Sequence, residues 1–451
     1  MNTAHAHRHA VGAPAGHRRV ASSSARLSLS AKLLIAVMLI VICEGAVRKW
    51  VADGSTLPLI LLRDLLSVFA IVRAVRLGHF RRLRAVTQVL LVWTCCVVGW
   101  GLLQLTLGQS SFPIYVIGLR FWLLSIWFAV AVAAGMSERD FAVTLRILMA
   151  SLVLMAPLVA LQQRSPPDSF INKSLSDDPR AVFLVTADVA RATGTFSFTA
   201  GFVAYVSLCV PFVLGVLEAR KPLPKHLLMA ALVFAALVVC SLVSGSRAAY
   251  FYSGGLLAIY LLGNLLLTSA RKKGRALVAA VVALCLIGAT AYFFGGAIDA
   301  TKERFALAAQ NEDMAGRIQT VFLGEPETLA KATWLGAGVG IGSNLASSYW
   351  PTGDVLFAFG EAENGRTISE GGLLGMAYIA LKLAAIVAGL VAGLRIALRT
   401  RTVFPIIVWV NVALAVMSWS AIGQLTAHAL LGLMLALGLL TLRFPNMRFF
   451  G

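Results

Sequence analysis

Arginine side chains are the residues of this sequence best suited to bind an anion, and four of them stand in or beside polar segments. Arg191 begins the run Arg-Ala-Thr-Gly-Thr-Phe-Ser-Phe-Thr-Ala-Gly, Arg247 ends a Ser-Gly-Ser-Arg turn, and Arg317 and Arg366 lie in one long polar stretch. An arginine carries a planar fork of N–H donors that matches diphosphate oxygens. A structural salt bridge is the alternative for each one, whereas the four together favour a common anionic ligand.

Carboxylates supply the second half of such a site. Glu361 and Glu363 stand in Gly-Glu-Ala-Glu-Asn-Gly-Arg, and Glu370 begins Glu-Gly-Gly-Leu-Leu-Gly. A carboxylate that is partly desolvated has a raised pKa and can accept a proton from an attacking hydroxyl group. The alternative for each glutamate is a solvated loop residue paired with an arginine. His428 is the one histidine expected near them, and a lone histidine in a helix is more typical of packing.

Several other kinds of site lack the residues they need. The six cysteines lie in apolar runs and show neither disulfide nor zinc spacing. The glycine series in 336–342 has no Lys-Ser or Lys-Thr after it, so it is not a Walker loop for ATP. His5, His7 and His9 alternate in a polar tail that lacks the fixed geometry of a metal site. The sequence therefore predicts no metal and no other cofactor.

The composition shows what must position these residues. Of 451 residues, 59% are hydrophobic and 13% are charged, and the mean hydropathy is +0.83. Soluble domains are roughly 45–50% apolar and about 25% charged. Only a lipid bilayer shields so much apolar surface from water, which excludes a soluble enzyme, a secreted disulfide scaffold and a disordered chain.

About twelve apolar runs are long enough to cross some 30 Å of hydrocarbon as helices. They are 31–50, 57–77, 86–107, 112–135, 141–162, 195–217, 226–244, 248–268, 275–295, 369–394, 403–422 and 426–443. The fold expected is therefore an all-α polytopic membrane protein with about twelve transmembrane helices. The transmembrane domain would cover 33–451, after a disordered basic tail over 1–32 that is not a cleaved signal peptide.

The net charge of +19 comes from 39 Lys and Arg residues against 20 acids. The basic residues gather in the N-terminal tail, in alternate turns and at the C-terminus, which the positive-inside rule assigns to the cytoplasm. Both termini are therefore expected to be cytoplasmic. The charge is interpreted as a topology signal with some attraction to anionic lipid, and not as a nucleic-acid surface.

Two long segments, 163–194 and 296–368, interrupt the otherwise short turns of the opposite, outer face. The second lies between the ninth and tenth expected helices. Long loops in compact proteins are usually functional or disordered. Aromatic residues such as Trp334 and Tyr349 favour folding of the second loop, which we expect to cap the membrane domain.

Charged residues inside the apolar runs are further candidates, because burying a charge in a membrane is costly. Arg63 and Asp64 point about 100° apart on a helix and are expected to pair with different neighbours. Arg120 lies in the middle of its run, in Gly-Leu-Arg-Phe-Trp.

A last charged group ends the first apolar run. Glu44 and Arg48 have the i, i+4 spacing of a favourable helical ion pair, which we interpret as structural. Lys49 and Trp50, which follow, are interpreted as an interfacial anchor.

The order of these features resembles the bacterial O-antigen ligase and polymerase superfamily of integral membrane glycosyltransferases. The resemblance covers about 33–445, and it is carried by the order of short motifs and by their places relative to the spans. The motifs are 191–201, 244–247, the outer loop with Arg317 and 336–344, 363–366 and 370–375. The stretch 44–50, with Arg63-Asp64, also resembles a polymerase-like branch of the superfamily.

This resemblance implies transfer of a glycan from an undecaprenyl-diphosphate carrier to an acceptor hydroxyl at the periplasmic face of the bacterial inner membrane. The residues implied for binding the diphosphate are Arg191, Arg247, Arg317 and Arg120. The residues implied for catalysis and acceptor positioning are Glu363, Arg366 and Glu370. No metal is implied, because the sugar–diphosphate bond supplies the energy. The implied partners are a lipid-linked oligosaccharide, a glycan acceptor, the bilayer, and a flippase and chain-length regulator, without nucleic acid.

The sequence departs from the ligases of this superfamily at one residue. Those ligases share a histidine in the large loop, whereas this loop has none and Glu363 stands in the comparable Ala-Glu-Asn context. The departure favours a polymerase of O-antigen, capsule or exopolysaccharide repeat units over a ligase that transfers glycan to lipid A-core. A transporter or flippase shares the twelve-span layout, although no internal repeat is evident. A binding-only role in glycan export is the third alternative.

Overall fold

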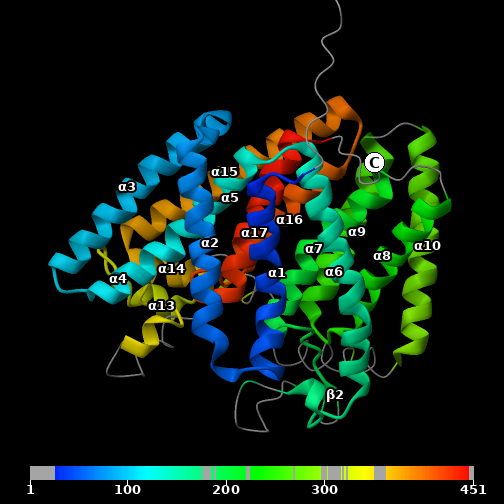
Figure 1. Cartoon of the computed structure of the whole chain (residues 1–451), viewed down its shortest axis with the longest axis horizontal. Coiled ribbons are helices and arrows are strands. Elements are labelled where there is room, and N and C mark those ends of the chain that lie inside the picture. The colour runs from blue at the N-terminus through cyan, green and yellow to red at the C-terminus, as the bar shows by residue number, and fades with distance from the viewer. Residues whose placement is uncertain are drawn as a thin grey trace, which may run out of the picture.

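The computed structural model describes residues 26–173, 175, 184–186, 189–219, 224–267, 270–295, 302, 316, 319–320, 324–349 and 362–445. Over these ranges the chain is a bundle of α-helices (Figure 1), ten of whose helical stretches are long and apolar enough to cross a membrane. These stretches are α1 (Leu29–Trp50), α2 (Thr56–Arg76), α3 (Arg84–Thr106), α4 (Phe112–Leu119) continued by η3 (Arg120–Leu124) and α5 (Ser125–Gly135), α6 (Glu138–Arg164), α7 (Thr199–Ala219), α8 (Pro224–Val243), α9 (Arg247–Leu267), α15 (Leu373–Thr400) and α17 (Leu425–Arg443).

Two further predicted runs correspond to helices whose described apolar parts are shorter. They are α10 (Ala270–Phe293) and α16 (Phe404–Ser418). A polytopic, multi-pass helical fold is thus confirmed, and each predicted run overlaps at least one helix, whereas the predicted number of twelve spans stays a prediction. The remaining elements are η1 (Asp53–Ser55), η2 (His79–Leu83), η4 (Phe170–Asn172), the antiparallel pair β1 (Leu184–Thr186) and β2 (Val189–Ala190), α13 (Pro326–Ala330), η6 (Ala346–Tyr349) and α14 (Glu363–Gly371).

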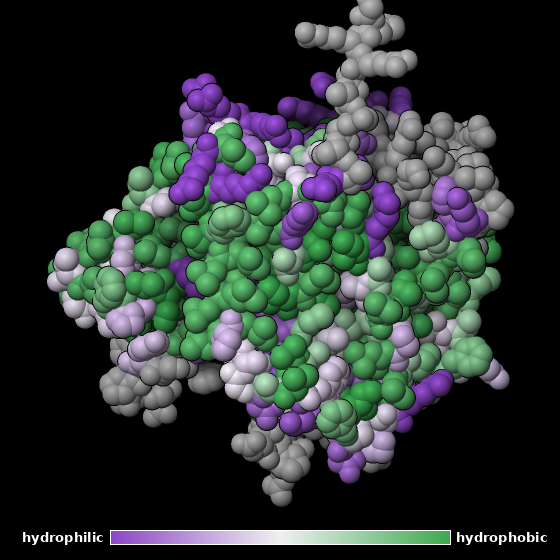
Figure 2. Space-filling model, in the orientation of Figure 1, coloured by the Kyte–Doolittle hydropathy of each residue, from purple (hydrophilic) through white to green (hydrophobic). Residues whose placement is uncertain are grey.

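The outer surface of the bundle is apolar over its middle. Figure 2 shows hydrophobic side chains across the centre of the visible face, with hydrophilic side chains gathered above and below them. Large apolar residues such as Leu65, Val92 and Leu266 are mostly exposed. A surface of this kind is stable against lipid and not against water, so the bilayer is the environment that the fold requires.

The core is built around α7, whose side chains are nearly all buried. Its sequence is hydrophobic all round, which is typical of a helix that has neighbours on every side. Phe202, Tyr205 and Phe212 on α7 are fully buried. The main apolar cluster joins α7 to α1, α5, α6, α8, α16 and α17.

The first helix begins earlier than the sequence predicted. Ser28 caps α1, because its side-chain oxygen accepts the N–H of Ala31 at 3.2 Å, and its own N–H donates to Asp140 at 3.1 Å. The end of the predicted tail 1–32 is therefore helical from Leu29 onward. Residues 1–25 of that tail lie outside the described part of the chain.

The boundaries of three other elements also differ from the prediction. The helix expected over 369–394 is divided at Gly372, whose φ of 56° is a left-handed conformation that favours glycine. The expected loop 296–368 consequently ends in helix α14. The span expected over 403–422 ends at Ser418, and the one expected from 195 begins at Thr199.

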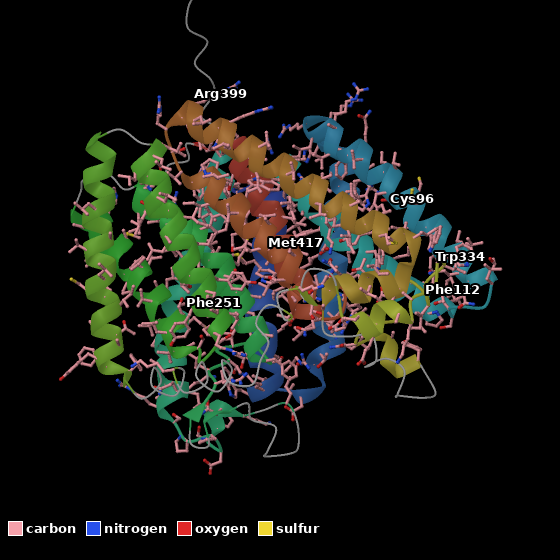
Figure 3. All side chains as sticks on the ribbon, turned by 180° about the vertical axis from the view of Figure 1, so that it is seen from behind. Cys96, Phe112, Phe251, Trp334, Arg399 and Met417 are labelled. Atoms are coloured by element: carbon pink, nitrogen blue, oxygen red, sulfur yellow. The ribbon has the colours of Figure 1, made fainter. Side chains whose placement is uncertain are left out.

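The described parts of the segment between α6 and α7, among them β1 and β2, lie at one end of the bundle, which we call the loop end (Figure 1). Arg399, in the last turn of α15, lies at the opposite end (Figure 3).

A cysteine-labelling experiment tests the predicted orientation. Asp168 and Arg399 are exposed on opposite ends of the bundle. Each can therefore be replaced by a single cysteine in a variant chain from which the native cysteines have been removed. We expect an impermeant thiol reagent to label Asp168→Cys in intact cells and Arg399→Cys only after permeabilisation, because the basic end should face the cytoplasm. The reverse pattern would overturn the predicted orientation.

Candidate functional site

Helix α14 is held at the loop end by the carboxylate of Glu370. This carboxylate accepts N–H groups from Gly342 at 2.8 Å, from Gly340 at 3.1 Å and from the indole of Trp122 at 2.9 Å. Burial raises the pKa of Glu370 to about 7, against the opposing effect of these donors, of which Trp122 is the strongest. Glu370 therefore positions the segment 336–344, which we call the glycine loop. Its predicted role as a proton acceptor stays a prediction.

The glycines of this loop allow backbone to touch backbone. Gly340 has a φ of 98°, and a Cβ atom there would meet the backbone of Gly118 at the end of α4. A Cβ atom on Gly118 would in turn meet the carbonyl group of Val339. Gln104 of α3 fixes the same loop, because its amide accepts the N–H of Val339 at 2.9 Å and donates to Leu335 O at 2.7 Å. The close approach of the loop backbone to α4 explains why glycines recur in this segment, which lacks the residues of a Walker loop for ATP.

The first turn of α14 packs against the segment between α16 and α17. Both carboxylate oxygens of Glu363 accept the N–H of Ile422 at 3.1 Å. Burial raises the pKa of Glu363, and the positive charge of Lys382 acts against this rise. Lys382, buried in α15, donates to the side chain of Asn364 at 2.9 Å. Arg366 donates to Gly342 O at 3.0 Å, so Arg366 and Glu370 both bind the glycine loop, whereas Glu363 binds the segment before α17.

A network of four charged side chains, two of them buried and two partly buried, lies close to α14. We call Glu44, Arg63, Asp64 and Arg120 the charge network. Glu44 accepts from Arg63 at 3.2 Å and from the hydroxyl of Thr426 at 3.0 Å. Asp64 binds Arg120 through two hydrogen bonds, one of them 3.1 Å long. Arg63 and Asp64 thus form their shortest ion pairs with different helices, which confirms the prediction.

The partner predicted for Glu44 was wrong. Arg48 donates to the hydroxyl of Ser197 at 3.2 Å, and Glu44 binds Arg63, 19 residues away. Arg63 is almost fully buried, so it needs a carboxylate more than a half-buried Arg48 does. The spacing within α1 could not reveal this competition between helices.

The charge network lies below the loop end and within the spans. Glu44 stands six residues before the end of α1, and Arg63 and Arg120 stand seven and eight residues after the first residues of α2 and α4. Each is therefore about 10 Å along its helix from the loop end, at 1.5 Å per residue. Arg120 is the first residue of η3, a π-helical turn inside an otherwise α-helical span. Such turns frequently occur at functional sites because they redirect side chains.

The charge network retains hydrogen-bond donors that no described residue satisfies. Arg63 Nη2 and Arg120 Nη1 are buried, and neither has an acceptor among the residues that the structure describes. His428 Nε2 is in the same situation, and its ring packs edge-on against Phe121, with 5.0 Å between ring centroids. This packing agrees with the interpretation of His428. The two guanidinium groups retain the capacity to bind an anion.

Two bridges join the charge network to α14. The segment 419–428 contacts both, because Ile422 donates to Glu363 and Thr426 donates to Glu44. The second bridge is η3, in which Arg120 belongs to the network and Trp122 donates to Glu370. The indole of Trp122 also packs against the rings of Trp93 and Tyr378, which contact each other. The two clusters are therefore parts of one structural unit.

Arg247 begins α9 at the end of a well-defined turn. Gly245 has a φ of 61°, and the hydroxyl of Ser244 accepts the N–H of Ser246 at 3.2 Å and donates to Ser241 O at 2.8 Å. The arginine is half-buried. The turn fixes the position of Arg247, which the sequence predicts to bind the diphosphate.

Arg191, also half-buried, precedes a segment that packs on the last turn of α1. Lys49 donates to the hydroxyl of Thr193 and to Gly194 O, both at 2.9 Å. Lys49 is buried, so its interpretation as an interfacial anchor was wrong. Arg317 and Glu361 lie outside the described residues.

Three residues of the site were not found from the sequence. Gln104, Trp122 and Lys382 fix the glycine loop, Glu370 and Asn364 respectively. A signal existed for Lys382, the one charged side chain in the first two thirds of α15, because a charge within a span usually has a specific partner. Gln104 and Trp122 give no such signal in an apolar run.

A scan of the chain against protein-family models finds no match, and a search of curated proteins finds no similar sequence. Among the described residues, no group of three or more His, Cys, Asp and Glu side chains is arranged to hold a metal ion. The function is therefore inferred from the contacts of the charge network and of α14.

The raised pKa of Glu370 predicts how stability depends on pH. The folded chain binds this proton more tightly than the unfolded chain, so folding takes up a proton between pH 4.5 and about 7. Stability should fall as the pH rises through this window, by roughly 3 kcal/mol in total. We expect Glu370→Gln to remove most of that slope, measured as the unfolding temperature in detergent at several pH values.

Glu327 provides the matched control, because it is an exposed carboxylate on the neighbouring α13. Glu327→Gln should keep the slope of the wild-type chain. A slope that survives in Glu370→Gln would show that another group carries the pH dependence.

Proposed function

We propose that this chain is a membrane glycosyltransferase that moves a glycan from an undecaprenyl-diphosphate carrier to a sugar acceptor at the periplasmic face of the bacterial inner membrane. The reaction would polymerise the repeat units of a surface polysaccharide, such as O-antigen, capsule or exopolysaccharide. The observation that carries the proposal is the pair Arg63 and Arg120, in which the buried atoms Arg63 Nη2 and Arg120 Nη1 have no acceptor among the described residues. An anionic leaving group is the ligand that such donors fit.

The carboxylates of the charge network support this role. Glu44 and Asp64 hold the two guanidinium groups in fixed orientations, so little reorganisation is needed when an anion binds. Two arginines buried within spans are costly unless they are paired or functional. Here each is paired and each keeps a further donor.

The acceptor side of the reaction would lie at α14. An acceptor oxygen attacks the anomeric carbon, the bond from that carbon to the diphosphate oxygen breaks, and the hydroxyl proton passes to a carboxylate. Glu363 and Glu370 are the carboxylates present, and burial raises the pKa of both, which suits a proton acceptor near neutral pH. Arg366, one turn from each, would orient the acceptor. The reaction needs no metal, because the sugar–diphosphate bond supplies its energy.

A transporter or flippase is the second candidate, and the charge network itself favours it. Ionisable side chains within spans also occur along the pathways of transported ions and solutes. A ligase that transfers glycan to lipid A-core would use the same geometry as a polymerase, so only its product distinguishes it.

Substitution of Arg120 tests the proposal. We expect Arg120→Ala and Arg120→Lys to lower glycan assembly by about 100-fold or more, because a lysine cannot reproduce the planar fork. The measurement is the amount and length of surface and lipid-linked glycans in a deletion strain that carries each variant. Arg146→Lys is the matched control, since Arg146 is an exposed arginine within a span. Because Nε and Nη2 of Arg120 already bind Asp64, full activity of both Arg120 variants at normal abundance would exclude Arg120 as a ligand of the anion.

The two arginines first predicted from the sequence allow a parallel test. Arg191→Ala and Arg247→Ala should abolish glycan assembly while the protein stays inserted and abundant, because each removes a cation from the diphosphate. If both variants keep normal activity, neither residue binds the diphosphate.

The products in the deletion strain separate the candidate functions. Single repeat units that accumulate on the carrier indicate a polymerase. Long carrier-linked chains that never reach their final acceptor indicate a ligase. Unaltered glycans would contradict the glycosyltransferase proposal and favour transport of another solute.

A further inference from the structure

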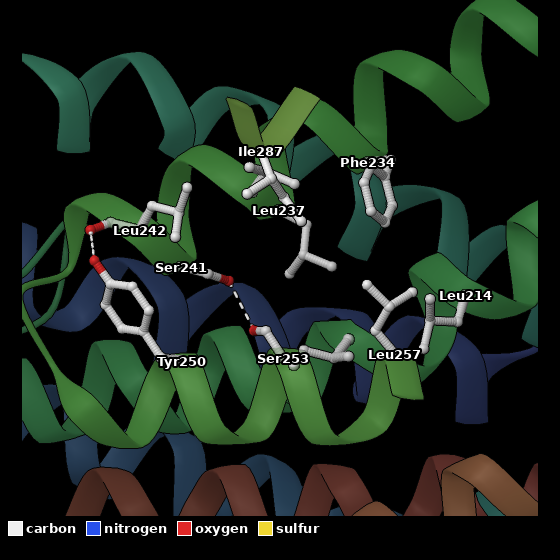
Figure 4. A pocket seen from close by; sticks show the side chains of 12 residues that line it. Leu214, Phe234, Leu237, Ser241, Leu242, Tyr250, Ser253, Leu257 and Ile287 are labelled. Carbon is white, nitrogen blue, oxygen red and sulfur yellow. Dashed lines mark hydrogen bonds between the residues drawn. The ribbon is translucent and has the colours of Figure 1, made fainter. Parts of the chain in front are cut away.

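An apolar cavity of about 210 Å³ lies among α7, α8, α9 and α10 (Figure 4). Ser241 and Ser253 in its walls hydrogen-bond to each other at 2.8 Å, and Tyr250 donates to Leu242 O at 2.7 Å. The walls consequently offer little besides carbon, and apolar contact is non-directional, so the cavity does not select one apolar occupant over another. A group of charged side chains at the end of the bundle opposite the loop end is more selective, because its donors have directions.

Four basic side chains surround the last turn of α5. We call them the basic cluster, and they are Arg73 of α2, His79 and Arg82 of η2, and Arg443 of α17. Arg82 donates to Ala134 O at 3.2 Å, and Arg443 donates to Ala133 O. A Cβ atom built on Gly135 would meet Nδ1 of His79 and the hydroxyl of Ser30, and Arg73 donates to that hydroxyl at 3.3 Å. The basic cluster is therefore built around three consecutive residues at the end of one helix.

The basic cluster lies at the depth of lipid headgroups. Helix α5 ends at Gly135, and α6 begins at Glu138 and continues for 27 residues to the loop end. At 1.5 Å per residue the cluster is about 40 Å from the loop end. A bilayer is about 40–45 Å thick when its headgroups are included. Figure 2 shows hydrophilic side chains gathered at this end of the bundle, as expected where the spans leave the hydrocarbon.

The protein does not neutralise the charge of the basic cluster. No ion pair among the described residues includes one of its members. Of the two carboxylates in the first turn of α6, Glu138 is exposed, and Asp140 already accepts hydrogen bonds from Ser28 and Ser137. The carbonyl end of a helix carries roughly half a negative elementary charge, which is less than the charge of two guanidinium groups. An excess of positive charge therefore remains.

The two arginines that cap α5 keep further hydrogen-bond donors. Each uses Nη1 for a carbonyl group, and Nε and Nη2 of both have no acceptor among the described residues. Arg443 also lies over the ring of Phe444, 4.9 Å from its centroid, which leaves the edge of the guanidinium group available. Arg82 is exposed and Arg443 is partly exposed. Because the two groups cap adjacent carbonyls, two forks of donors lie close together.

We propose that the basic cluster binds the phosphate group of an anionic membrane lipid in the leaflet at this end of the bundle, an inference that goes beyond the proposed function and does not rest on it. Phosphate oxygens match the donors of a guanidinium fork. A lipid fits better than free phosphate, because Val75 and Leu77 before η2 and Val86 after it are exposed apolar side chains. The lipid chains pack on this apolar surface while the headgroup binds the arginines between the spans.

Two pairs of arginines provide the test. Arg82→Gln with Arg443→Gln removes both forks, and Arg81→Gln with Arg84→Gln removes equal charge from exposed positions in and beside η2. Each purified full chain in detergent is incubated with phosphatidylglycerol, and the bound lipid is measured by native mass spectrometry. We expect the first pair to weaken binding by about tenfold or more, because one hydrogen bond to a charged group already contributes roughly that factor.

The control pair should weaken binding by less than about threefold at physiological salt, because the charges of exposed side chains are screened. Equal weakening by both pairs would show that only diffuse charge attracts the lipid and would overturn the proposal. Unchanged binding in the first pair would overturn it as well.

The wild-type chain allows a measurement that needs no variant, since both arginines also cap α5 and their removal could unfold the chain. Phosphatidylglycerol carries one net negative charge, whereas phosphatidylcholine is neutral overall and presents a quaternary ammonium group that the cluster repels. We expect phosphatidylglycerol to bind about tenfold more tightly or better. Equal binding of the two lipids would contradict the proposal, whatever the stability of the variants.

Competition with inorganic phosphate distinguishes a lipid from a soluble anion. Inorganic phosphate should displace phosphatidylglycerol only at large excess, because it has no chains to pack on Val75 and Leu77. Displacement at equal concentration would show that the cluster binds soluble phosphate and would overturn the assignment to a lipid.

Discussion

The ion pairs Glu44–Arg63 and Asp64–Arg120 are the constraint on which the loop end of this molecule depends. A charge in the low-dielectric interior of a membrane protein must be close to its counter-charge, and losing one partner leaves the other with a large desolvation penalty. The four side chains come from α1, α2 and η3. Thr426 of α17 donates a hydrogen bond to the carboxylate of Glu44. The loop ends of these helices therefore have to converge at one depth.

The position of α14 follows from that convergence. Once η3 is fixed by Arg120, Trp122 is directed to Glu370, and once α17 is fixed by Thr426, the preceding segment presents Ile422 to Glu363. The glycine loop then fits between α4 and α14, where no side chain larger than hydrogen is accommodated at Gly118 and Gly340. The ion pairs thus fix η3 and α17, these elements fix Glu370 and Glu363 of α14, and α14 fixes the glycine loop through close backbone contacts.

The sequence predicted the local features of this arrangement and missed the long-range ones. Apolar runs of about 20 residues are recognisable without any knowledge of neighbours, so each predicted run overlaps a helix, although several boundaries differ. The pairing of Glu44 was missed because its partners, Arg63 and Thr426, are 19 and 382 residues away, whereas Arg48 has the favourable local spacing. Lys49 was assigned to the membrane interface for the same reason, because its hydrogen-bond partner, the carbonyl group of Gly194, is far away in the sequence.

The bridges between the charge network and α14 also bear on the choice between a transferase and a transporter. A transporter alternates between two arrangements, so the groups that bind its solute must move with one half of the protein against the other. Here the network is joined to α14 through both η3 and the segment 419–428, and Trp122 packs in one aromatic cluster with Trp93 and Tyr378. Moving one cluster relative to the other would break several buried hydrogen bonds at once. A rigid link of this kind suits catalysis, in which preorganised donors stabilise a charge that develops beside a fixed acceptor.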